Sequence, residues 1–169
     1  MSCNGNAGHA SNGAWSGFRS GSVKSSSSCL APAYPSNRRR ACFESALEYS
    51  KTRHAFGKPI GAMQLTQQKL ANMATSIVQG RLLAHRLGML KDQGQLHPVQ
   101  VSVTKRANVR AALDIARSAR TILGANGITL EYPVARHMAN LESVLTYEGT
   151  EEVHTLIIGK ELTGENAFG

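Results

Sequence analysis

The sequence predicts an all-α domain, an antiparallel helical bundle, preceded by a disordered N-terminal tail. Apolar residues recur at helical spacing in four substantial segments, whereas no stretch shows the period of two that marks a half-buried strand. Short breaks separate these segments, as expected for helices that pack against antiparallel neighbours. The composition also changes abruptly near Ala41, so the expected domains are residues 1–40 and residues 41–169.

Residues 1–40 form the expected tail. They are rich in Ser, Gly and Asn, and such a composition buries too little apolar surface to offset the entropy lost on ordering. The run Arg38, Arg39 and Arg40 is expected to be solvated. An acid-free tail that bears Arg and Ser is compatible with an organelle transit peptide. A foreign or mis-framed start joined to a genuine domain explains it equally well.

The helices are marked by apolar periodicity and by residues that break it. Gly57 and Pro59 end the first helix, and Pro98 suits the first turn of a later one. Gly124 and Gly127 form a turn between two helices. The expected helices cover residues 41–53, 64–93, 98–123, 133–140 and 151–162.

Composition excludes several classes of protein. Five of the eight net positive charges lie in residues 1–40, so the folded part is only mildly basic and no nucleic-acid partner is expected. No apolar run approaches the roughly 20 residues of a membrane span. Three scattered cysteines favour neither a disulfide framework nor a zinc site, and no histidine pair has metal-ligand spacing, so no metal is expected. A reducing intracellular compartment is the simpler interpretation.

In the segment from Leu145 to His154, one carboxylate, that of Glu148, lies at a turn before an apolar helix. Gly149 lets the backbone approach a ligand closely. Thr150 is a good N-cap, and the two glutamates that follow it suit the positive end of the helix dipole. Glu148 is therefore placed like a catalytic base. From the local pattern alone, a plain loop-to-helix junction is the alternative.

Three segments together resemble the acyl-CoA dehydrogenase family. The sequence TYEGT at residues 146–150 resembles its catalytic signature, and ARTILGANGI at residues 119–128 resembles its flavin-contacting glycine turn. The sequence RHAFGKPI at residues 53–60 resembles its Arg-x-x-Phe-Gly motif. All three occur in the family's order at roughly its spacing, over about residues 41–169. The run NLESVLTYE at residues 140–148 looks most like the glutaryl-CoA dehydrogenase branch.

The resemblance implies α,β-dehydrogenation of an acyl-CoA thioester with FAD as cofactor. Glu148 would remove the acidic α-proton while the β-hydrogen leaves as hydride to the flavin. An ordinary Glu is a weak base for this proton, and exclusion of water by substrate and flavin would strengthen it. Thr150 would donate its hydroxyl to the flavin. Tyr147 and Gly149 would line the substrate site.

The resemblance also implies further cofactor-binding residues. Gly124, Asn126 and Gly127 would let the backbone approach the phosphate or adenine end of the flavin, although a helix C-cap is the alternative interpretation. This chain has Ala125 where relatives commonly have Gly.

Arg53 would supply a cation to the flavin diphosphate of a neighbouring subunit, with Phe56 packed beside it. A surface arginine near a helix end is the alternative. Gln64 is a weaker cofactor-binding candidate, and a solvated residue at the start of a helix explains it as well.

Family members also carry an N-terminal helical domain and a middle β-domain, which hold most contacts to the flavin ring. The resemblance therefore implies a C-terminal fragment of an acyl-CoA dehydrogenase, inactive and weak in FAD binding by itself. A complete enzyme would use an acyl-CoA substrate, electron-transferring flavoprotein as acceptor and a homo-oligomeric, homotetrameric assembly. It would lie in the bacterial cytoplasm or the mitochondrial matrix. The alternative is a catalytically silent bundle that acts in self-association.

Overall fold

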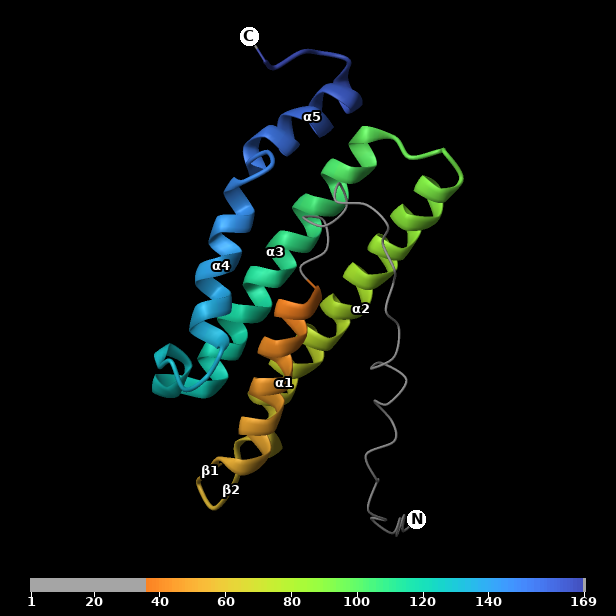
Figure 1. Cartoon of the computed structure of the whole chain (residues 1–169). Helices are drawn as coiled ribbons and strands as arrows, with labels where there is room; N and C mark the ends of the chain where they lie inside the picture. The colour runs from red at the N-terminus through yellow and green to blue at the C-terminus, as the bar shows by residue number, and fades with distance from the viewer. Residues whose placement is uncertain (1–35, 169) are drawn as a thin grey trace, which may run out of the picture.

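The computed structural model describes residues 36–168 and shows an all-helical fold with one small hairpin (Figure 1). The disorder expected for residues 1–35 lies outside the described residues. The elements are α1 (Ser36–Thr52), β1 (His54–Ala55), β2 (Lys58–Pro59), the 3-10 helix η3 (Ile60–Ala62), α2 (Gln64–Asp92), α3 (Pro98–Leu123), the 3-10 helix η4 (Gly124–Ile128), α4 (Val134–Thr146) and α5 (Glu151–Thr163).

Helix α3 is the centre of the bundle and packs against α1, α2, α4 and α5 (Figure 1). Successive helices from α1 to α4 run in alternating directions, which confirms the predicted antiparallel arrangement. Helix α5 continues past the end of α4 and contacts α3. Because α3 is surrounded in this way, a side chain on it reaches the connections between the other helices.

The core is almost wholly aliphatic, as the low aromatic content suggests. Ile115, Leu123 and Leu141 are among its largest fully buried side chains. Cys42 is also buried, and its burial raises the pKa of the thiol to about 12. Among the described residues, no helix is both long and apolar enough to cross a membrane.

The first helix begins at Ser36, five residues before the predicted boundary at Ala41. The prediction that the arginine run is solvated is wrong for Arg39, which is fully buried. Its guanidinium nitrogen Nη1 donates to Asn108 Oδ1 on α3 at 3.2 Å. This contact draws the polar start of α1 into the bundle, which composition alone does not indicate.

Helix α4 extends to Thr146, six residues beyond the predicted end at Asn140. Its buried residues Val134, Leu141 and Val144 follow one helical face past that point. Asn140 lies on the exposed face instead of ending the helix. The longer helix delivers the chain directly to the Glu148 segment.

The connection between α1 and α2 is a tight two-strand hairpin, in which His54 pairs with Pro59 and Ala55 with Lys58. Its two central residues, Phe56 and Gly57, both have positive φ, at 52° and 76°. This is the pattern of the turn that matches the twist of antiparallel strands.

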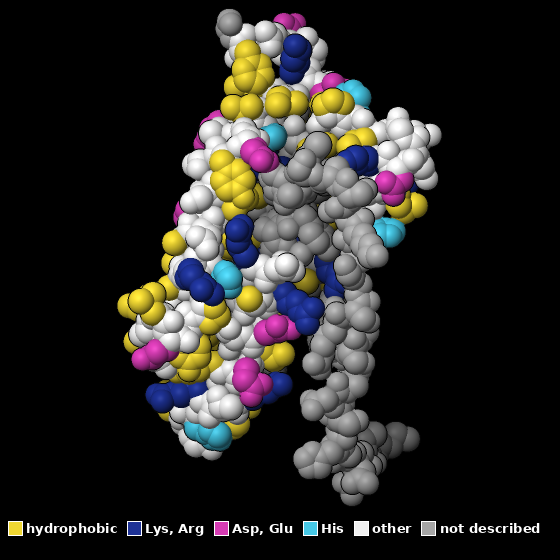
Figure 2. All heavy atoms as spheres, in the orientation of Figure 1, with side chains coloured by type: hydrophobic (Ala, Val, Ile, Leu, Met, Phe, Trp, Pro, Cys, Tyr) yellow, Lys and Arg dark blue, Asp and Glu magenta, His cyan; other side chains and the backbone are white. Residues whose placement is uncertain are grey.

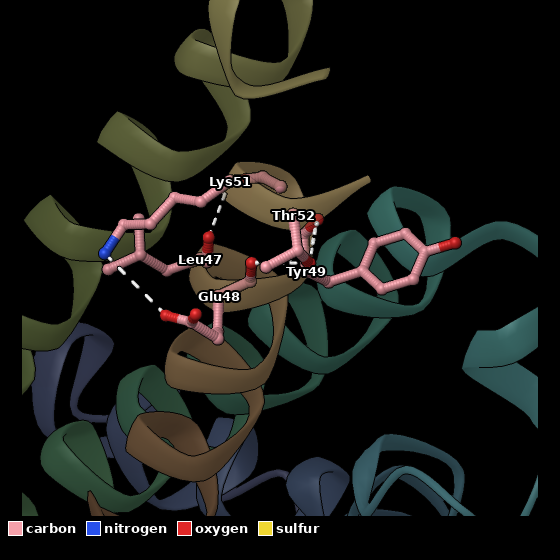
Figure 3. Close-up of polar contacts among 6 residues, drawn as sticks. Leu47, Glu48, Tyr49, Lys51 and Thr52 are labelled. Atoms are coloured by element: carbon pink, nitrogen blue, oxygen red, sulfur yellow. Dashed lines mark hydrogen bonds and ion pairs between the residues drawn. The ribbon is translucent and has the colours of Figure 1, made fainter. Parts of the chain in front are cut away.

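Before the hairpin, the last turn of α1 is stabilised by its own side chains (Figure 3). Thr52 Oγ1 donates to the carbonyl oxygen of Glu48 at 3.2 Å, and Lys51 Nζ lies 3.8 Å from Glu48 Oε2. The Tyr49 ring projects away from this pair, towards the neighbouring helices.

Candidate active site

The turn between α4 and α5 has an unusual backbone. Glu148 has φ of 53°, a left-handed value that is uncommon for a residue with a side chain, and Gly149 follows with φ of 91°. The Glu148 side chain is exposed. Strained positions of this kind persist where the surrounding structure holds them, and they are concentrated at functional sites. The turn thus presents one carboxylate at the start of α5.

Thr150 is the N-cap of α5, as predicted, and its Oγ1 accepts a hydrogen bond from the Val153 N–H at 3.4 Å. The Thr150 hydroxyl and the backbone of Glu152 hold the pKa of the Glu152 carboxyl below its usual range. The Glu152 side chain itself is exposed. The Thr150 hydroxyl thus stabilises the start of α5.

Replacing Thr150 with alanine should lower the free energy of unfolding of the 169-residue chain by about 1 kcal/mol, since one N-terminal amide of α5 loses its acceptor. Thr150→Ser keeps the hydroxyl and should remain near the parent value. Urea titration followed by circular dichroism measures both. A Thr150→Ala variant as stable as Thr150→Ser would show that this hydroxyl contributes nothing as a cap.

Glu151 anchors the first turn of α5 to α3. Its carboxylate Oε1 pairs with Arg106 Nε at 3.4 Å and with Arg110 Nη2, and its side chain is mostly buried. From sequence, Glu151 was expected only to interact with the helix dipole. The two arginines add a contact between helices, which fixes the position of the helix that follows the Glu148 turn.

Beneath the turn lies Lys105 of α3, a residue that the sequence analysis missed. Its Nζ donates to the carbonyl oxygens of Tyr147, Glu148 and Gly149 at 2.5, 3.1 and 2.6 Å. Nζ also lies 5.9 Å from the centre of the Tyr147 ring. Lys105 is only 4% exposed. A signal was present in the sequence, because Lys105 lies at helical spacing with the inward-facing Val109 and Ala112.

His154 of α5 packs against the turn from a different side than Lys105. Its Nδ1 lies 3.1 Å from Ser102 Oγ on α3, and both residues are buried. Burial and the Lys105 charge lower the pKa of His154, while the nearby backbone of Glu148 and Gly149 opposes this shift. The burial of His154 favours a structural role for this histidine.

A second group of predicted cofactor-binding residues lies at the hairpin. Arg53 precedes β1 and is exposed, and Gln64 is exposed at the start of α2. Phe56 is 94% exposed at the tip of the turn. A large aromatic ring held outwards on a tight turn is available to pack against another molecule.

The glycine turn that follows α3 makes mainly internal contacts. Gly124 ends α3 with φ of 60°. Asn126 Nδ2 donates to Tyr49 Oη at 3.1 Å, which ties η4 to α1. A Cβ at Gly127 would lie 2.6 Å from the carbonyl oxygen of Arg120, so only glycine fits there. The turn therefore has a clear packing role alongside any cofactor role.

The structure brings some of the predicted residues together and separates others. Tyr147, Glu148, Gly149 and Thr150 form one continuous turn. The hairpin and η4 lie towards the opposite end of α4 (Figure 1). Helix α4 has 13 residues, which at the usual rise per residue is roughly 20 Å. Within the described part of the chain, no three His, Cys, Asp or Glu side chains are grouped to hold a metal ion.

Comparison with known protein families matches residues 36–163 to the acyl-CoA dehydrogenase C-terminal domain. The chain belongs to the acyl-CoA dehydrogenase family. The match begins at the residue where α1 begins and includes both the Glu148 turn and the hairpin. It also confirms the resemblance that the three sequence motifs indicated.

The chain is similar to glutaryl-CoA dehydrogenase of Desulfococcus multivorans, with 36% identity over 74% of this chain and 32% of that protein. A solved glutaryl-CoA dehydrogenase from Mycobacterium smegmatis superposes with a TM-score of 0.81 at 56% identity, over 83% of this chain and 37% of that one. A second solved structure from the same organism, a complex with FADH2, has a TM-score of 0.80 at 48% identity and the same coverage. The chain thus spans about a third of the length of these relatives.

Proposed function

We propose that this chain supplies the catalytic base of an FAD-dependent acyl-CoA dehydrogenase that acts on glutaryl-CoA. The observation that carries the proposal is the exposed Glu148 carboxylate on its left-handed turn, within a domain of this family. No other acidic side chain of the turn is as suitable. Glu151 pairs with two arginines, and Glu152 lies in the first turn of α5.

The chemistry assigned to the turn is proton abstraction. Glu148 takes the proton from the carbon next to the thioester carbonyl, and the backbone of the adjacent Gly149 lines the substrate site. When bound, FAD supplies the acceptor for the hydride that leaves the neighbouring carbon. The Thr150 hydroxyl would help to hold the flavin as a hydrogen-bond donor. Tyr147, 43% exposed, lines the substrate side.

The separation of the two groups of residues supports an assembly of several subunits. Arg53, Phe56 and Gln64 are exposed and lie far from Glu148, so we assign them to the flavin of a neighbouring subunit. Arg53 would neutralise the diphosphate, and Phe56 would pack beside it. In such an assembly the substrate is an acyl-CoA, and electron-transferring flavoprotein accepts the electrons.

A chimera tests the proposed function. In it, residues 36–168 replace the corresponding C-terminal domain of a full-length glutaryl-CoA dehydrogenase relative. The purified chimera should be yellow, and its flavin absorption should bleach when glutaryl-CoA is added without oxygen. The relative without its C-terminal domain is the control and should remain unreduced. A chimera that binds flavin but is not bleached by glutaryl-CoA or butyryl-CoA would contradict the proposal.

The second candidate, self-association by a catalytically silent bundle, is favoured by a different observation. Several large apolar side chains of the described residues are strongly exposed, among them Leu65, Leu130 and Leu162 at 71%, 93% and 80%. On the face shown in Figure 2, hydrophobic side chains gather near the two ends of the molecule. Such patches commonly mark interaction surfaces. A colourless oligomer of the chain, together with an unreduced chimera, would favour this candidate.

A further inference from the structure

All three donors of the Lys105 ammonium group are taken by carbonyl oxygens of the Glu148 turn. An ammonium has three hydrogens to donate and no acceptor. Here three successive carbonyl oxygens, from residues 147, 148 and 149, lie within 2.5 to 3.1 Å of Nζ. A buried cation without acceptors is strongly unfavourable, so this lysine and this turn require one another.

The three contacts also define the shape of the turn. For three consecutive carbonyl groups to point at one atom, the backbone must curl around that atom. Glu148 does so with φ of 53°, and its side chain then points to the exposed side. A non-glycine residue keeps such a conformation only when its surroundings hold it. Lys105 is the group that touches every residue of the curl.

The turn is confined from a second direction by His154. A Cβ at Gly149 would lie 3.0 Å from His154 Nε2, so the imidazole packs directly against that residue. Ser102, one helical turn before Lys105 on α3, lies 3.1 Å from His154 Nδ1. Lys105 and His154 thus hold the turn between them, and both depend on α3.

The attachment of α5 does not depend on Lys105. Glu151 pairs with Arg106 and Arg110, and Thr150 caps the helix by itself. Loss of the lysine side chain therefore leaves the contacts that dock α5 on α3 in place. Loss of the lysine removes only the hydrogen-bond donors to the carbonyl oxygens of residues 147–149.

We propose that Lys105 is a positioning residue, which holds the turn so that Glu148 presents its carboxylate to the substrate. Lys105 makes no contact of its own with the reacting atoms, because it is buried beneath the turn. The catalytic part of this inference rests on the proposed function, whereas the structural part does not. Two experiments separate them.

The structural experiment uses the 169-residue chain. Lys105→Met keeps the length of the side chain and removes all three donors. In a crystal structure of this variant, Glu148 should leave the left-handed region, while Glu151 still pairs with Arg106. Lys160→Met, which changes an exposed lysine of α5, should leave the turn unchanged. A Lys105→Met structure in which Glu148 keeps φ near the parent value would overturn the proposal.

The kinetic experiment uses the chimera, with stopped-flow measurement of flavin reduction by glutaryl-CoA. A misplacement of the base by about 1 Å is expected to slow the reduction step roughly 10- to 100-fold. The fraction of flavin reduced should stay unchanged, and the isotope effect of deuterium at the α-carbon should increase. A purely structural role would lower the amount of active protein but alter neither the rate constant nor the isotope effect.

If the Lys105→Met chimera does not bind flavin, Lys105→Arg is measured in its place. Arginine keeps the charge, but its planar group does not place three donors around one point. It should fold and show the same slow reduction in a milder form. Parent-like reduction in whichever of the two variants binds flavin would refute the positioning role. If the unsubstituted chimera is not reduced at all, the proposed function fails, and the structural experiment still decides the role of Lys105.

Discussion

Replacing Glu148 with glutamine should slow flavin reduction in the chimera by about 10²- to 10⁴-fold, the usual effect of removing a general base. The amide has nearly the same shape as the carboxylate, but it does not accept the proton from the substrate. Flavin content and affinity for glutaryl-CoA should change little, because the turn is held through backbone carbonyls and not through the Glu148 side chain.

Glu142→Gln is the matched control for this prediction. Glu142 is the nearest preceding acidic residue, and its carboxylate accepts a hydrogen bond from Arg117 Nη2 at 3.1 Å on the surface of the bundle. Its replacement should leave the rate of reduction within about two-fold of the parent, since exposed ion pairs contribute little. Near-normal reduction in Glu148→Gln, at unchanged flavin content, would mean that another group takes the α-proton.

The largest effect on stability should come from Leu141→Ala. Leu141 is fully buried on α4, within the core formed with α3. Its truncation removes apolar contacts and leaves a cavity, which typically costs about 2–5 kcal/mol. A loss of this size is a large fraction of the stability of a small domain, commonly about 5–15 kcal/mol. Urea unfolding of the 169-residue chain should therefore show a clear shift of the midpoint.

Leu130→Ala makes the same chemical change at an exposed site and serves as the control. Leu130 is 93% exposed in the loop after η4, so its replacement should alter the free energy of unfolding by less than about 0.5 kcal/mol. The difference between the two variants measures burial alone, because both lose the same atoms. Equal effects of the two substitutions would contradict the packing of α4 described above.

Features that depend on neighbouring residues could mostly be predicted from the sequence. Helical periodicity predicted the all-α bundle, and Pro98 does lie at the first turn of α3. Thr150 caps α5 because a hydroxyl in that position reaches an amide of the same turn. The candidate base could be selected for a similar reason, since Glu148, Gly149 and Thr150 are adjacent. Both the cap and the position of the carboxylate depend on residues that are neighbours in the sequence.

Local pattern was less reliable where packing decides the outcome. Helix α1 begins earlier than predicted because buried Arg39 binds Asn108, 69 residues further along the chain. Helix α4 continues past Asn140 because its apolar face continues to pack on the core. Arg39 belongs to α1 because of its buried contact. Asn140 belongs to α4 because it lies on the exposed face of that helix.

The contacts that hold the candidate base come from the packing of the helices. Lys105 meets the carbonyl of Tyr147 across 42 residues, and Asn126 meets the Tyr49 hydroxyl across 77. No helical or strand period links residues at such separations, so their partners appear only once the helices are packed. The sequence predicted, through its resemblance to the family, which carboxylate would act as a base. The packing of α3 beneath the turn places the Lys105 ammonium group where it donates to three converging carbonyl oxygens.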